Sequence, residues 1–570
     1  MGSIIKKKIK NNIYYYFVES ARVNGKPRIV SQVYLGTAQA VFDKLNDLTK
    51  QKQPLYSEIS DFADVMLLYD IATRLDIIAI INKHATKRSQ GITVGEYALI
   101  AALNRVIAPA SKSCIASWYS GTVLPQILLI NESALSPQNY WNHMRIADDT
   151  LNAIDEEMVV KIINTYNIDT SHLIYDATNF YTFIDTKQPS ELAKRGRSKE
   201  KRNDLKIVGL SMMITPDCNI PLLYDTYPGN NPDSKQFTVM VNKLKTRFER
   251  LTSRPTDITV IFDRGNNSAD NIIDLESEPL PLHYVGGLKR SQCADLYEVP
   301  NEHFIPLEGK CFNASTAYRT SRNVFDREMT IVVVFNPSLF AGQMQGVMDN
   351  IEKTMGKLSE LQSRLRDRAE GRITKGRAPT TASVEKQVKG FLGTEFMNDI
   401  FDCEMTTLNG IPYFNFSLSS IKFNRLQETI LGKTVLFTNR HNWTNEEIAS
   451  SYRSAWHIEH AFRQMKDADH LTVRPLFHWT DQKIKIHIFY CVLAYRLCCI
   501  LMKELQSEGI SNYSLNRILD QMSDIKFVTT VLGTSQSDIL TSFSKGTNLA
   551  ESITSSYDLK AKYLQLMSVR

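Results

Sequence analysis

The spacing of apolar and polar residues divides the chain into segments of different character. Between residues 13 and 36, two β-forming runs flank Asn24-Gly25, a pair that favours a tight hairpin turn. From about residue 61 to 168, apolar residues recur three and four positions apart, which is the spacing of amphipathic helices. We therefore expect an N-terminal β-hairpin and then a helical region, which could be scaffold or could bind nucleic acid.

A strand-rich pattern begins at residue 171. The runs SHLIYDATNF, LKIVGLSMMI and NIPLLYDTYP have the apolar character of buried strands, and the helical run QFTVMVNKLKTRFERL follows them. The strand DITVIFD, a short helix and the strand LHYVGG come next. Three strands, a helix, a strand, a helix and a strand, in this order, predict an α/β layer built on a mixed sheet.

This regular order is lost after about residue 289. A β-like stretch, MTIVVVFNP, precedes a long charged helical run from about residue 339 to 372, which we interpret as a solvated or two-helix face rather than a nucleic-acid contact. KTVLFTN resumes the buried-strand pattern, and the chain is mainly helical from residue 445. The middle of the chain therefore looks like a β-rich and helical insertion that splits one α/β domain.

These patterns, with a length of 570 residues, predict several domains. We expect a β-hairpin region at 1–55 and a helical, possibly DNA-binding, domain at 56–168. The α/β domain would occupy 169–290 and 433–505, interrupted by an insertion at 291–432 and followed by a helical C-terminal region at 506–570.

Composition changes this picture little. The net charge of +6 permits a polyanionic partner without establishing one. The eight cysteines are scattered without a C-x-x-C pair, which is typical of reduced thiols in a cytosolic protein. The start of the chain lacks an apolar core of signal-peptide length, so we expect a cytoplasmic protein.

One apolar stretch, residues 486–502, is barely long enough to span a bilayer. It contains His487 and Arg496. We interpret it as a buried helix with Arg496 at its edge, and expect no membrane association.

Two aspartates mark the ends of predicted strands. Asp176 follows the apolar run LIY, and Asp263 follows VIF. A single aspartate at a strand end commonly has only a capping role. Two in one sheet, on adjacent strand ends, would lie a few ångströms apart and would both be ionised at neutral pH only if cations neutralise them.

A third acidic residue lies in the helical run that begins at residue 445. At 100° per residue, four residues share a sector of about 60°: Tyr452, Glu459, Arg463 and Lys466. A solvated face with ion pairs is the usual interpretation of such a set. Tyr452 and Glu459 border the apolar stripe that would dock the helix, which favours an active-site carboxylate.

Together these features resemble the DDE transposases of bacterial and archaeal insertion sequences, specifically the insertion-sequence-four-like group. That group carries a Y-x2-R-x3-E-x6-K signature, and Tyr452, Glu459 and Lys466 are in register with it. Ala455 occupies the arginine position; Arg453 and Arg463 are the candidates to replace it, and the helical angles favour Arg463. The segments RGRSKEKRNDLKIVGL, DRGNNSADNI and HLTVRPLFHW extend the resemblance over about residues 170 to 500.

The resemblance implies a ribonuclease-H-like catalytic domain that cuts DNA strands and transfers the freed 3′-hydroxyl to target DNA. Asp176, Asp263 and Glu459 would be both the catalytic residues and the ligands of two Mg²⁺ ions, with Mn²⁺ as a substitute, about 3.5–4 Å apart. The three carboxylates should then converge within about 4–6 Å. The expected partners are double-stranded DNA, as transposon ends and target, and a second copy of the chain on that DNA.

Cations that could hold phosphates cluster in residues 187–206, where eight basic and three acidic residues leave a net charge of +5. A solvated loop is the alternative to a phosphate contact, and we favour the contact. Its DNA-binding candidates are Arg195, Arg197, Lys199, Lys201 and Arg202. Nearer the cleavage site we expect contacts from Arg264, Arg463, Lys466 and Tyr452. The histidines after residue 456 have no cysteine partner and no H-E-x-x-H, so we do not expect zinc.

Two other functions remain open at this point. The same scaffold could be a nuclease that cuts without joining. The chain could also be a catalytically silent DNA-binding protein derived from a transposase.

Overall fold

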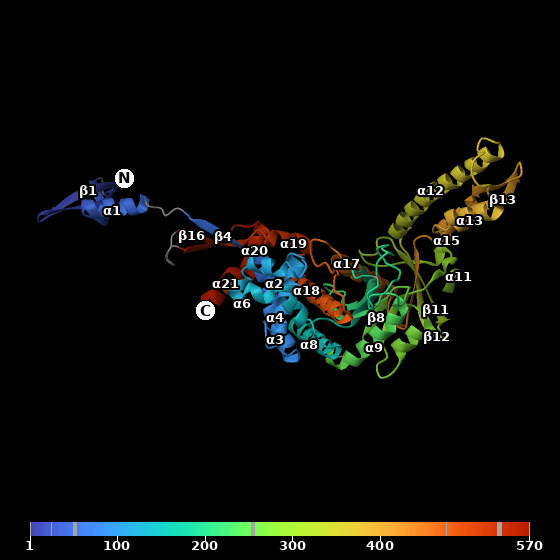
Figure 1. Cartoon of the computed structure of the whole chain (residues 1–570), viewed down its shortest axis with the longest axis horizontal. Helices are drawn as coiled ribbons and strands as arrows, with labels where there is room; N and C mark the ends of the chain where they lie inside the picture. Colours follow the sequence, from blue (N-terminus) through green and yellow to red (C-terminus); the bar gives the residue numbers. More distant parts are fainter. Residues whose placement is uncertain are drawn as a thin grey trace. The chain divides into compact units, whose positions relative to one another are not determined.

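The structure of the protein is a computed structural model that describes residues 2–23, 26–49, 54–185, 187–251, 257–474, 476–532 and 539–568. The chain forms two compact units, which are shown in Figure 1. Unit one is built from the described residues of the ranges 1–66, 121–127 and 518–570, and unit two from those of 67–120 and 128–517.

Unit one contains two antiparallel three-stranded sheets. The first sheet consists of β1 (Gly2–Ile9), β2 (Asn12–Val23) and β3 (Lys26–Gly36), and α1 (Ala38–Thr49) follows it. Strands β2 and β3 pair directly, which confirms the predicted hairpin, although the turn residues Asn24-Gly25 lie outside the described residues. The lysine-rich start of the chain, which precedes the hairpin in the sequence, forms the edge strand β1.

The second sheet of unit one joins segments far apart in the sequence. Strand β4 (Tyr56–Asp61) pairs with β16 (Lys526–Val531), which pairs with β17 (Ile539–Phe543). Helices α20 (Asn548–Ser556) and α21 (Leu559–Ser568) complete the C-terminal part, and Phe62 packs on Phe543 with 4.6 Å between the ring centroids. The C-terminal region is mainly helical, as expected, but it also contains β16 and β17, which the sequence pattern did not predict. Residues 526–531, KFVTTV, are β-branched and aromatic, but their partner strand lies about 470 residues earlier, beyond the reach of a local pattern.

The helical region predicted from residue 61 to 168 is confirmed. Its helices are α2 (Ala63–Arg74), α3 (Ile77–His84), α4 (Val94–Ile107), α5 (Ile115–Ser120), α6 (Leu124–Leu128), η1 (Glu132–Leu135), α7 (Pro137–His143) and α8 (Asp148–Tyr166). Helix α4 starts at a capping box in which Thr93 and Glu96 satisfy each other's backbone N–H groups. It packs against α18 (Asp481–Ser507), the longest apolar helix of unit two.

A nine-stranded mixed sheet forms the centre of unit two. Its strands are β5 (His172–Tyr181), β6 (Ile207–Ile214), β7 (Pro221–Pro228), β8 (Thr259–Phe262), β9 (His283–Gly287), β10 (Ile305–Pro306), β11 (Thr316–Val324), β12 (Arg327–Phe335) and β15 (Lys433–Thr438). Their order in the sheet is β10-β11-β12-β15-β9-β8-β5-β6-β7. The pairs β5–β8 and β8–β9 are parallel and the remaining pairs are antiparallel.

Helix α9 (Asp233–Leu251) follows β7, and α10 (Ala269–Glu276) follows β8. The predicted order of three strands, helix, strand, helix and strand is thus confirmed. On one face of the sheet, Phe237 of α9 packs between Tyr175 and Phe262, at centroid distances of 4.8 and 4.9 Å.

The chain between β9 and β15 contributes both to this sheet and to a separate layer. Elements η2 (Arg290–Gln292), α11 (Ala294–Tyr297), η3 (Asn301–His303) and β10 lead into β11 and β12, which extend the main sheet. The layer beyond them consists of α12 (Pro337–Ala369), α13 (Thr381–Leu392), α14 (Met397–Ile400), the hairpin of β13 (Phe401–Leu408) and β14 (Ile411–Leu418), and α15 (Ser420–Thr429). These elements lie together in Figure 1 and share a hydrophobic cluster that includes Leu358, Val384 and Phe414. The predicted interruption of the sheet is present, and the domain boundaries stay a prediction.

Helices α16 (Asn445–Arg453), α17 (Trp456–Gln464), α18 and α19 (Leu515–Met522) follow β15. Among the described residues, α18 alone is long and apolar enough to cross a membrane by length and composition, and 94% of its most apolar 18-residue window is buried inside the protein. The expectation of a buried helix is met. Arg496, however, lies in the core with 0% of its side chain exposed, and not at an edge.

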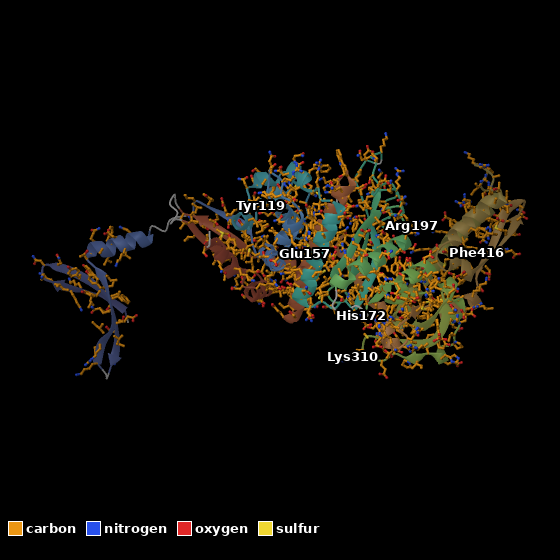
Figure 2. The ribbon with its side chains drawn as sticks, turned by 90° about the horizontal axis from the view of Figure 1, so that it is seen from below. Tyr119, Glu157, His172, Arg197, Lys310 and Phe416 are labelled. Atoms are coloured by element: carbon orange, nitrogen blue, oxygen red, sulfur yellow. The ribbon has the colours of Figure 1, made fainter. Side chains whose placement is uncertain are left out.

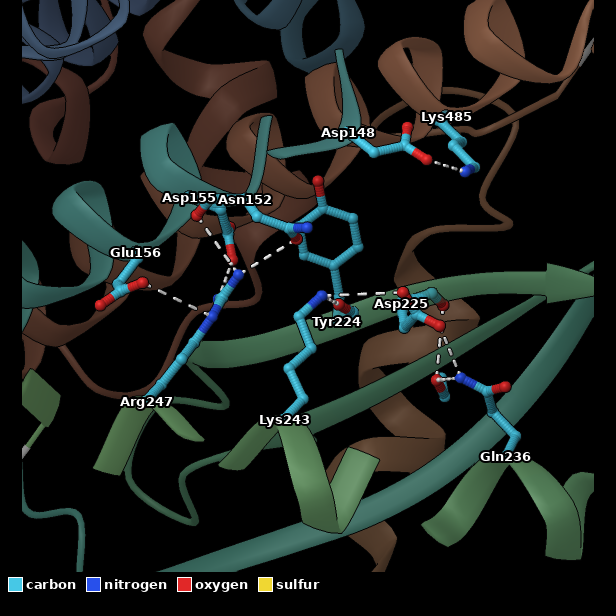
Figure 3. A network of polar contacts seen from close by, with 11 residues as sticks. Asp148, Asn152, Asp155, Glu156, Tyr224, Asp225, Gln236, Lys243, Arg247 and Lys485 are labelled. Atoms are coloured by element: carbon cyan, nitrogen blue, oxygen red, sulfur yellow. Dashed lines mark hydrogen bonds and ion pairs between the residues drawn. The ribbon is translucent and has the colours of Figure 1, made fainter. Parts of the chain in front are cut away.

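A buried ion triad explains how the core holds Arg496. Asp155 of α8 accepts hydrogen bonds from Arg496 at 2.6 Å and from Arg247 of α9 at 2.8 Å. Figure 3 shows the surrounding network, in which Lys243 lies 3.6 Å from Asp225. Because each charge is paired, α8, α9 and α18 can carry these groups into the interior.

Candidate functional site

The two predicted aspartates lie at the same level of the sheet. Asp263 directly follows the end of β8, as predicted, but Asp176 lies within β5, five residues before the end of that strand. The parallel register of β5 and β8 ends with Tyr175 opposite Phe262, and Asp176 and Asp263 are the next residues on the two strands. Strands in a sheet lie about 4.8 Å apart, so the two carboxylates are next to each other. Because side chains alternate along a strand, they face away from the side on which Tyr175 and Phe262 contact α9.

The turn after β8 fixes the carboxylate of Asp263. Its Oδ1 accepts hydrogen bonds from the backbone N–H of Gly265 at 3.0 Å and from the side-chain amide of Asn266 at 2.7 Å. The amide of the buried Asn267 donates to the backbone oxygen of Gly287, at the end of β9, at 2.6 Å. The segment DRGNNS, which the sequence shows only as polar, is therefore a hydrogen-bonded turn that fixes the orientation of the Asp263 carboxylate.

The surroundings of Asp176 oppose its ionisation. Burial raises the pKa of Asp176 to about 7; Lys199 and the backbone N–H of Ala177 lower it, and Asp263 and Asp233 raise it further. The negative charge of Asp263 on the neighbouring strand end therefore acts on the Asp176 carboxyl at close range. A cation at this position would favour the ionised form of Asp176.

Glu459 reaches the site from the helices that follow β15. A cavity of about 330 Å³ is lined by Asp263 together with Tyr452 and Arg453 of α16 and Trp456 and Glu459 of α17. Helix α17 packs on β5, and α16 packs on β8, β9 and β15. The second aspartate and the predicted glutamate thus face one cavity.

Tyr452 lies against the backbone of β9. A Cβ at Gly287 would lie 2.6 Å from the Tyr452 hydroxyl oxygen, so only glycine at this position allows the ring its place. Burial raises the pKa of Tyr452 to about 12, and the charges of Asp263 and Glu459 act in the same direction. Tyr452 is therefore a neutral phenol at physiological pH.

The helix that the sequence predicts through Tyr452 and Glu459 is broken. Ser454 and Ala455 lie between α16 and α17, and the N–H of Ala455 donates to the oxygen of Tyr452 only three residues earlier. The Ser454 hydroxyl donates to the backbone oxygen of Ser451 at 2.6 Å, which supports this tightened turn. The prediction of one continuous helix, with 100° of rotation per residue from Tyr452 to Glu459, is therefore wrong.

The two candidate arginines differ in their relation to the cavity that Asp263 and Glu459 line. Arg453 lines the cavity of Asp263 and Glu459 and stacks over Phe312, with 5.7 Å from its guanidinium carbon to the ring centroid. Arg463 is exposed on α17 and is not among the residues that line this cavity. Arg453 is thus the arginine that lines this cavity. The preference for Arg463 as the replacement of the signature arginine, and a DNA contact by Arg463, both stay predictions.

Lys466 lies just beyond the end of α17, over the strand of Asp176. It donates to the hydroxyl of Thr178 at 3.0 Å and lies 3.6 Å from a carboxylate oxygen of Glu200. Arg474 forms the stronger contact with the same glutamate, at 2.6 Å. Burial lowers the pKa of Lys466, and Glu200 opposes this shift.

The basic segment borders a pocket of about 890 Å³ beside β5. The predicted phosphate-binding residues that line it are Arg195, Arg197, Lys199 and Lys201; Arg202 is not among its lining residues. Arg197, labelled in Figure 2, is exposed there. Asn179 of β5 fixes the segment, because its side chain donates to the backbone oxygen of Arg197 and accepts from the N–H of Lys199, each at 3.1 Å. The loop of cations is thereby anchored three residues beyond Asp176.

Arg264 and Arg202 are the remaining predicted DNA contacts. Arg264 is exposed directly after Asp263, and its charge acts on Tyr452. Arg202 forms a two-pronged ion pair with Asp204 and stacks over Tyr181 at 5.3 Å.

The arrangement fits a metal ion in part. Among the described residues, no three Asp, Glu, His or Cys side chains lie close enough together to hold one metal ion, so the expected convergence of three carboxylates is absent. Three uncompensated anions would repel one another, and Glu459 is an exposed side chain that can keep its distance. Mg²⁺ is commonly bound by one or two carboxylates with substrate phosphates, so the adjacent pair of Asp176 and Asp263 does fit one ion.

Sequence reasoning missed several residues that the fold brings to this site. Asp233 begins α9, lines the basic pocket and lies 3.9 Å from Lys199. The hydroxyl of Tyr227 donates to Asp233 at 2.8 Å. Asn179 and Glu200 were likewise not singled out. Each is a common polar residue in a polar segment, so no local signal distinguishes it.

Comparison with known proteins gives matches of different strength. No protein of curated function matches the chain. Among solved structures, the cryo-EM structure of a piggyBac transposase synaptic complex with hairpin DNA is similar over 82% of each chain, at 10% identity and a TM-score of 0.39. The Mos1 transposase paired-end complex with the left transposon end matches 34% of this chain and 61% of its own, at 12% identity and a TM-score of 0.14. Both scores are too low to carry an argument.

The sequence model of one family, described as the transposase DDE domain, matches residues 167–497. This range begins just before β5 and ends within α18, so it includes both aspartates, the interruption of the sheet and Glu459. It covers more than half of the 570 residues. The chain therefore belongs to the DDE transposase family.

Proposed function

We propose that this protein cuts DNA at the ends of an insertion sequence and joins the freed ends to target DNA, with Asp176, Asp263 and Glu459 as its catalytic residues. The observation that carries the proposal is the register that puts Asp176 and Asp263 side by side, beneath the cavity that Asp263 shares with Glu459. Divalent Mg²⁺ or Mn²⁺, two ions in the full arrangement, would supply activation of a water or 3′-hydroxyl and neutralise phosphate charge.

The chain's own residues would then position the DNA. Asp176 and Asp263 are fixed by backbone and side-chain hydrogen bonds, whereas Glu459 is exposed and free to approach them. Arg453 and Tyr452, in the same cavity, would hold the phosphate that is cut. Closure of Glu459 over the aspartates would complete the ligand set.

The basic pocket would hold the DNA backbone next to the reacting bond. Arg195, Arg197, Lys199 and Lys201 supply charge without base readout, which predicts strongly salt-dependent binding. Arg264, Lys466, Arg463 and Arg202 would add contacts on either side.

Three finer assignments belong to the same proposal. The order β7-β6-β5-β8-β9, with one half antiparallel and the other parallel, supports a ribonuclease-H-like core. Tyr452, Glu459 and Lys466 support the insertion-sequence-four-like group. We further propose a homodimer on DNA, because two transposon ends must be held together. Its proposed location is the cytoplasm, in association with the nucleoid when DNA is bound.

The test is cleavage of a labelled transposon end in Mg²⁺ by the wild type and by Asp176→Ala, Asp263→Ala and Glu459→Gln. We expect each variant to lose at least a hundredfold in rate while keeping its DNA affinity at low metal. Asp270→Asn, an exposed aspartate on α10, is the matched control and should cut normally. If all three variants cut as well as the wild type, the assignment is wrong.

A second assay separates the alternatives. With precleaved ends and target DNA, a transposase joins the two, whereas a nuclease that only cuts yields no joined product. A silent DNA-binding descendant would bind the ends and give neither product.

A further inference from the structure

Two exposed aromatic side chains are in contact just beyond the end of the strand that carries Asp176, and a third exposed one follows two residues along the chain. They are Phe183, Phe477 and Trp479, with 46%, 51% and 64% of their surface exposed. The rings of Phe183 and Phe477 are 5.3 Å apart and inclined by 32°, and the N–H of Phe183 donates to the backbone oxygen of Leu476 at 3.0 Å. We call these three residues the aromatic shelf.

The backbone around the shelf explains why these rings face solvent. Residues 476 to 479 alternate, so that Leu476 is buried, Phe477 exposed, His478 turned inward and Trp479 exposed. His478 is held from below by Lys112, at 2.8 Å between the two nitrogens. The shelf is therefore held by its own strand-like backbone, and its rings contribute little to the core.

Cations border the shelf on the side that leads to the catalytic strand. Tyr181 contacts Phe183 edge-on at 5.5 Å, and the guanidinium groups of Arg202 and Arg474 lie over Tyr181 at 5.3 and 5.1 Å. Residues 187–206, with their net charge of +5, follow directly. The surface thus combines flat apolar faces with a net positive segment, although Arg202 and Arg474 themselves are paired with Asp204 and Glu200.

This combination fits unpaired nucleic acid better than duplex DNA or protein. Bases in a duplex stack on one another and offer only their edges, whereas unpaired bases have free faces that stack on aromatic rings while cations follow the backbone. A protein partner that needed only apolar contact would have no use for the bordering arginines. Tyr181 lies five residues beyond Asp176 on β5, about 17 Å along the strand.

We propose that the aromatic shelf binds unpaired bases of the DNA strand released next to Asp176, by stacking them on Phe183, Phe477 and Trp479. This inference rests on the proposed function, because strand cleavage is what frees such a strand. The shelf keeps the separated strand away from the carboxylates and from re-pairing.

The test measures binding of the full-length chain to labelled single-stranded DNA and to the same sequence as duplex, by fluorescence anisotropy. We expect the wild type to gain affinity for an end with an unpaired extension over a blunt duplex. Phe183→Ala, Phe477→Ala and Trp479→Ala should each weaken binding of unpaired DNA by roughly 5- to 150-fold and leave duplex binding unchanged. Ile421→Ala, at an 80%-exposed apolar residue of α15, is the control and should change neither.

Conservative variants and salt distinguish stacking from other causes. Trp479→Phe should retain most of the binding, and Trp479→Leu should lose it, because only the first keeps an aromatic face. The alanine variants should leave the salt dependence of binding unchanged, whereas Arg202→Gln should reduce its slope by about one unit.

Several outcomes would overturn the proposal. Equal affinity of the wild type for blunt and extended ends would do so, as would equal losses for Trp479→Phe and Trp479→Leu. A change in oligomeric state of the alanine variants without DNA, measured by sedimentation, would instead identify a protein-docking surface. Failure of the proposed function looks different: the shelf would still bind unpaired DNA, but paired ends would not be cut.

Discussion

The buried triad of Asp155, Arg247 and Arg496 gives a sharp prediction for Asp155→Asn. The substitution keeps the shape of the side chain and removes one negative charge shared by two guanidinium groups. The side chains of Arg496, Arg247 and Asp155 are 0%, 6% and 2% exposed, so water cannot replace the lost partner. Leaving a buried charge uncompensated costs about 3–5 kcal/mol.

The contacts that remain after the substitution indicate which arginine is left less well compensated. Arg247 keeps the side-chain and backbone oxygens of Asn152, at 3.2 and 3.3 Å, and lies 3.9 Å from Glu156. Arg496 keeps its hydrogen bond to the backbone oxygen of Pro221, at 2.9 Å, and its Nη2 has no hydrogen-bond partner among the described residues. We therefore expect a loss of about 3–5 kcal/mol, mainly through Arg496 and α18.

The measurement is urea unfolding at pH 7 and at acid pH, followed by tryptophan fluorescence. The two arginines hold the pKa of Asp155 below its usual value, so its stabilising effect is present above the unfolded value of 3.8 and is lost as the pH falls through the lower folded pKa. The difference between wild type and variant should therefore shrink at acid pH. Asp148→Asn, on the same helix, breaks an exposed pair with Lys485 and should cost less than about 1 kcal/mol. A loss below about 1 kcal/mol for Asp155→Asn, or a difference independent of pH, would refute this reasoning.

Three further predictions follow from single contacts. Burial raises the pKa of Asp64 to about 6 from 3.8, so the folded state binds the proton more tightly and the free energy of unfolding should fall as the pH rises from about 4 to 6. In urea unfolding, Asp64→Asn should raise the free energy of unfolding by up to about 3 kcal/mol at pH 7 and leave it unchanged at pH 4. Gly287→Ala places a methyl group 2.6 Å from the Tyr452 hydroxyl and should slow end cleavage at least tenfold with normal DNA affinity; unchanged cleavage would contradict a role for this contact. Glu200→Gln removes the carboxylate paired with Lys466 and Arg474, so duplex DNA should bind more tightly and the slope of log affinity against log salt concentration should steepen by up to about two units. Unchanged or weaker duplex binding would show that these two cations do not reach DNA.

Patterns with a local cause were predictable from the sequence. The strand-helix order of residues 171–287 follows from apolar runs whose length and composition suit buried strands, and the sheet has that order. Asp176 and Asp263 could be singled out because each follows such a run, and parallel pairing then places them side by side. The capped helical region before residue 168 followed from the same kind of signal.

Features that depend on tertiary contacts were not predictable. The rotation from Tyr452 to Glu459 assumed one helix, but the turn at Ser454 and Ala455 has no proline or glycine to announce it. Arg453, and not Arg463, lines the cavity, and the spacing of residues does not predict this. Asp233 and Asn179 gain their places through the end of β7 and the basic loop, which the spacing of residues does not encode.

The pairing of β9 with β15 also determines when, during synthesis of the protein, this part of the sheet can be completed. Gly287 leaves the ribosome about 145 residues before Lys433, which is roughly 7–30 s at typical rates of translation. During that interval the edge of β9 is an open template for other strands, and the two aspartates exist without Glu459. A nascent or truncated chain that ends before Lys433 therefore carries two of the three acidic residues and lacks the third. Catalytic competence, if the three residues act as proposed, arrives only with the last quarter of the polypeptide.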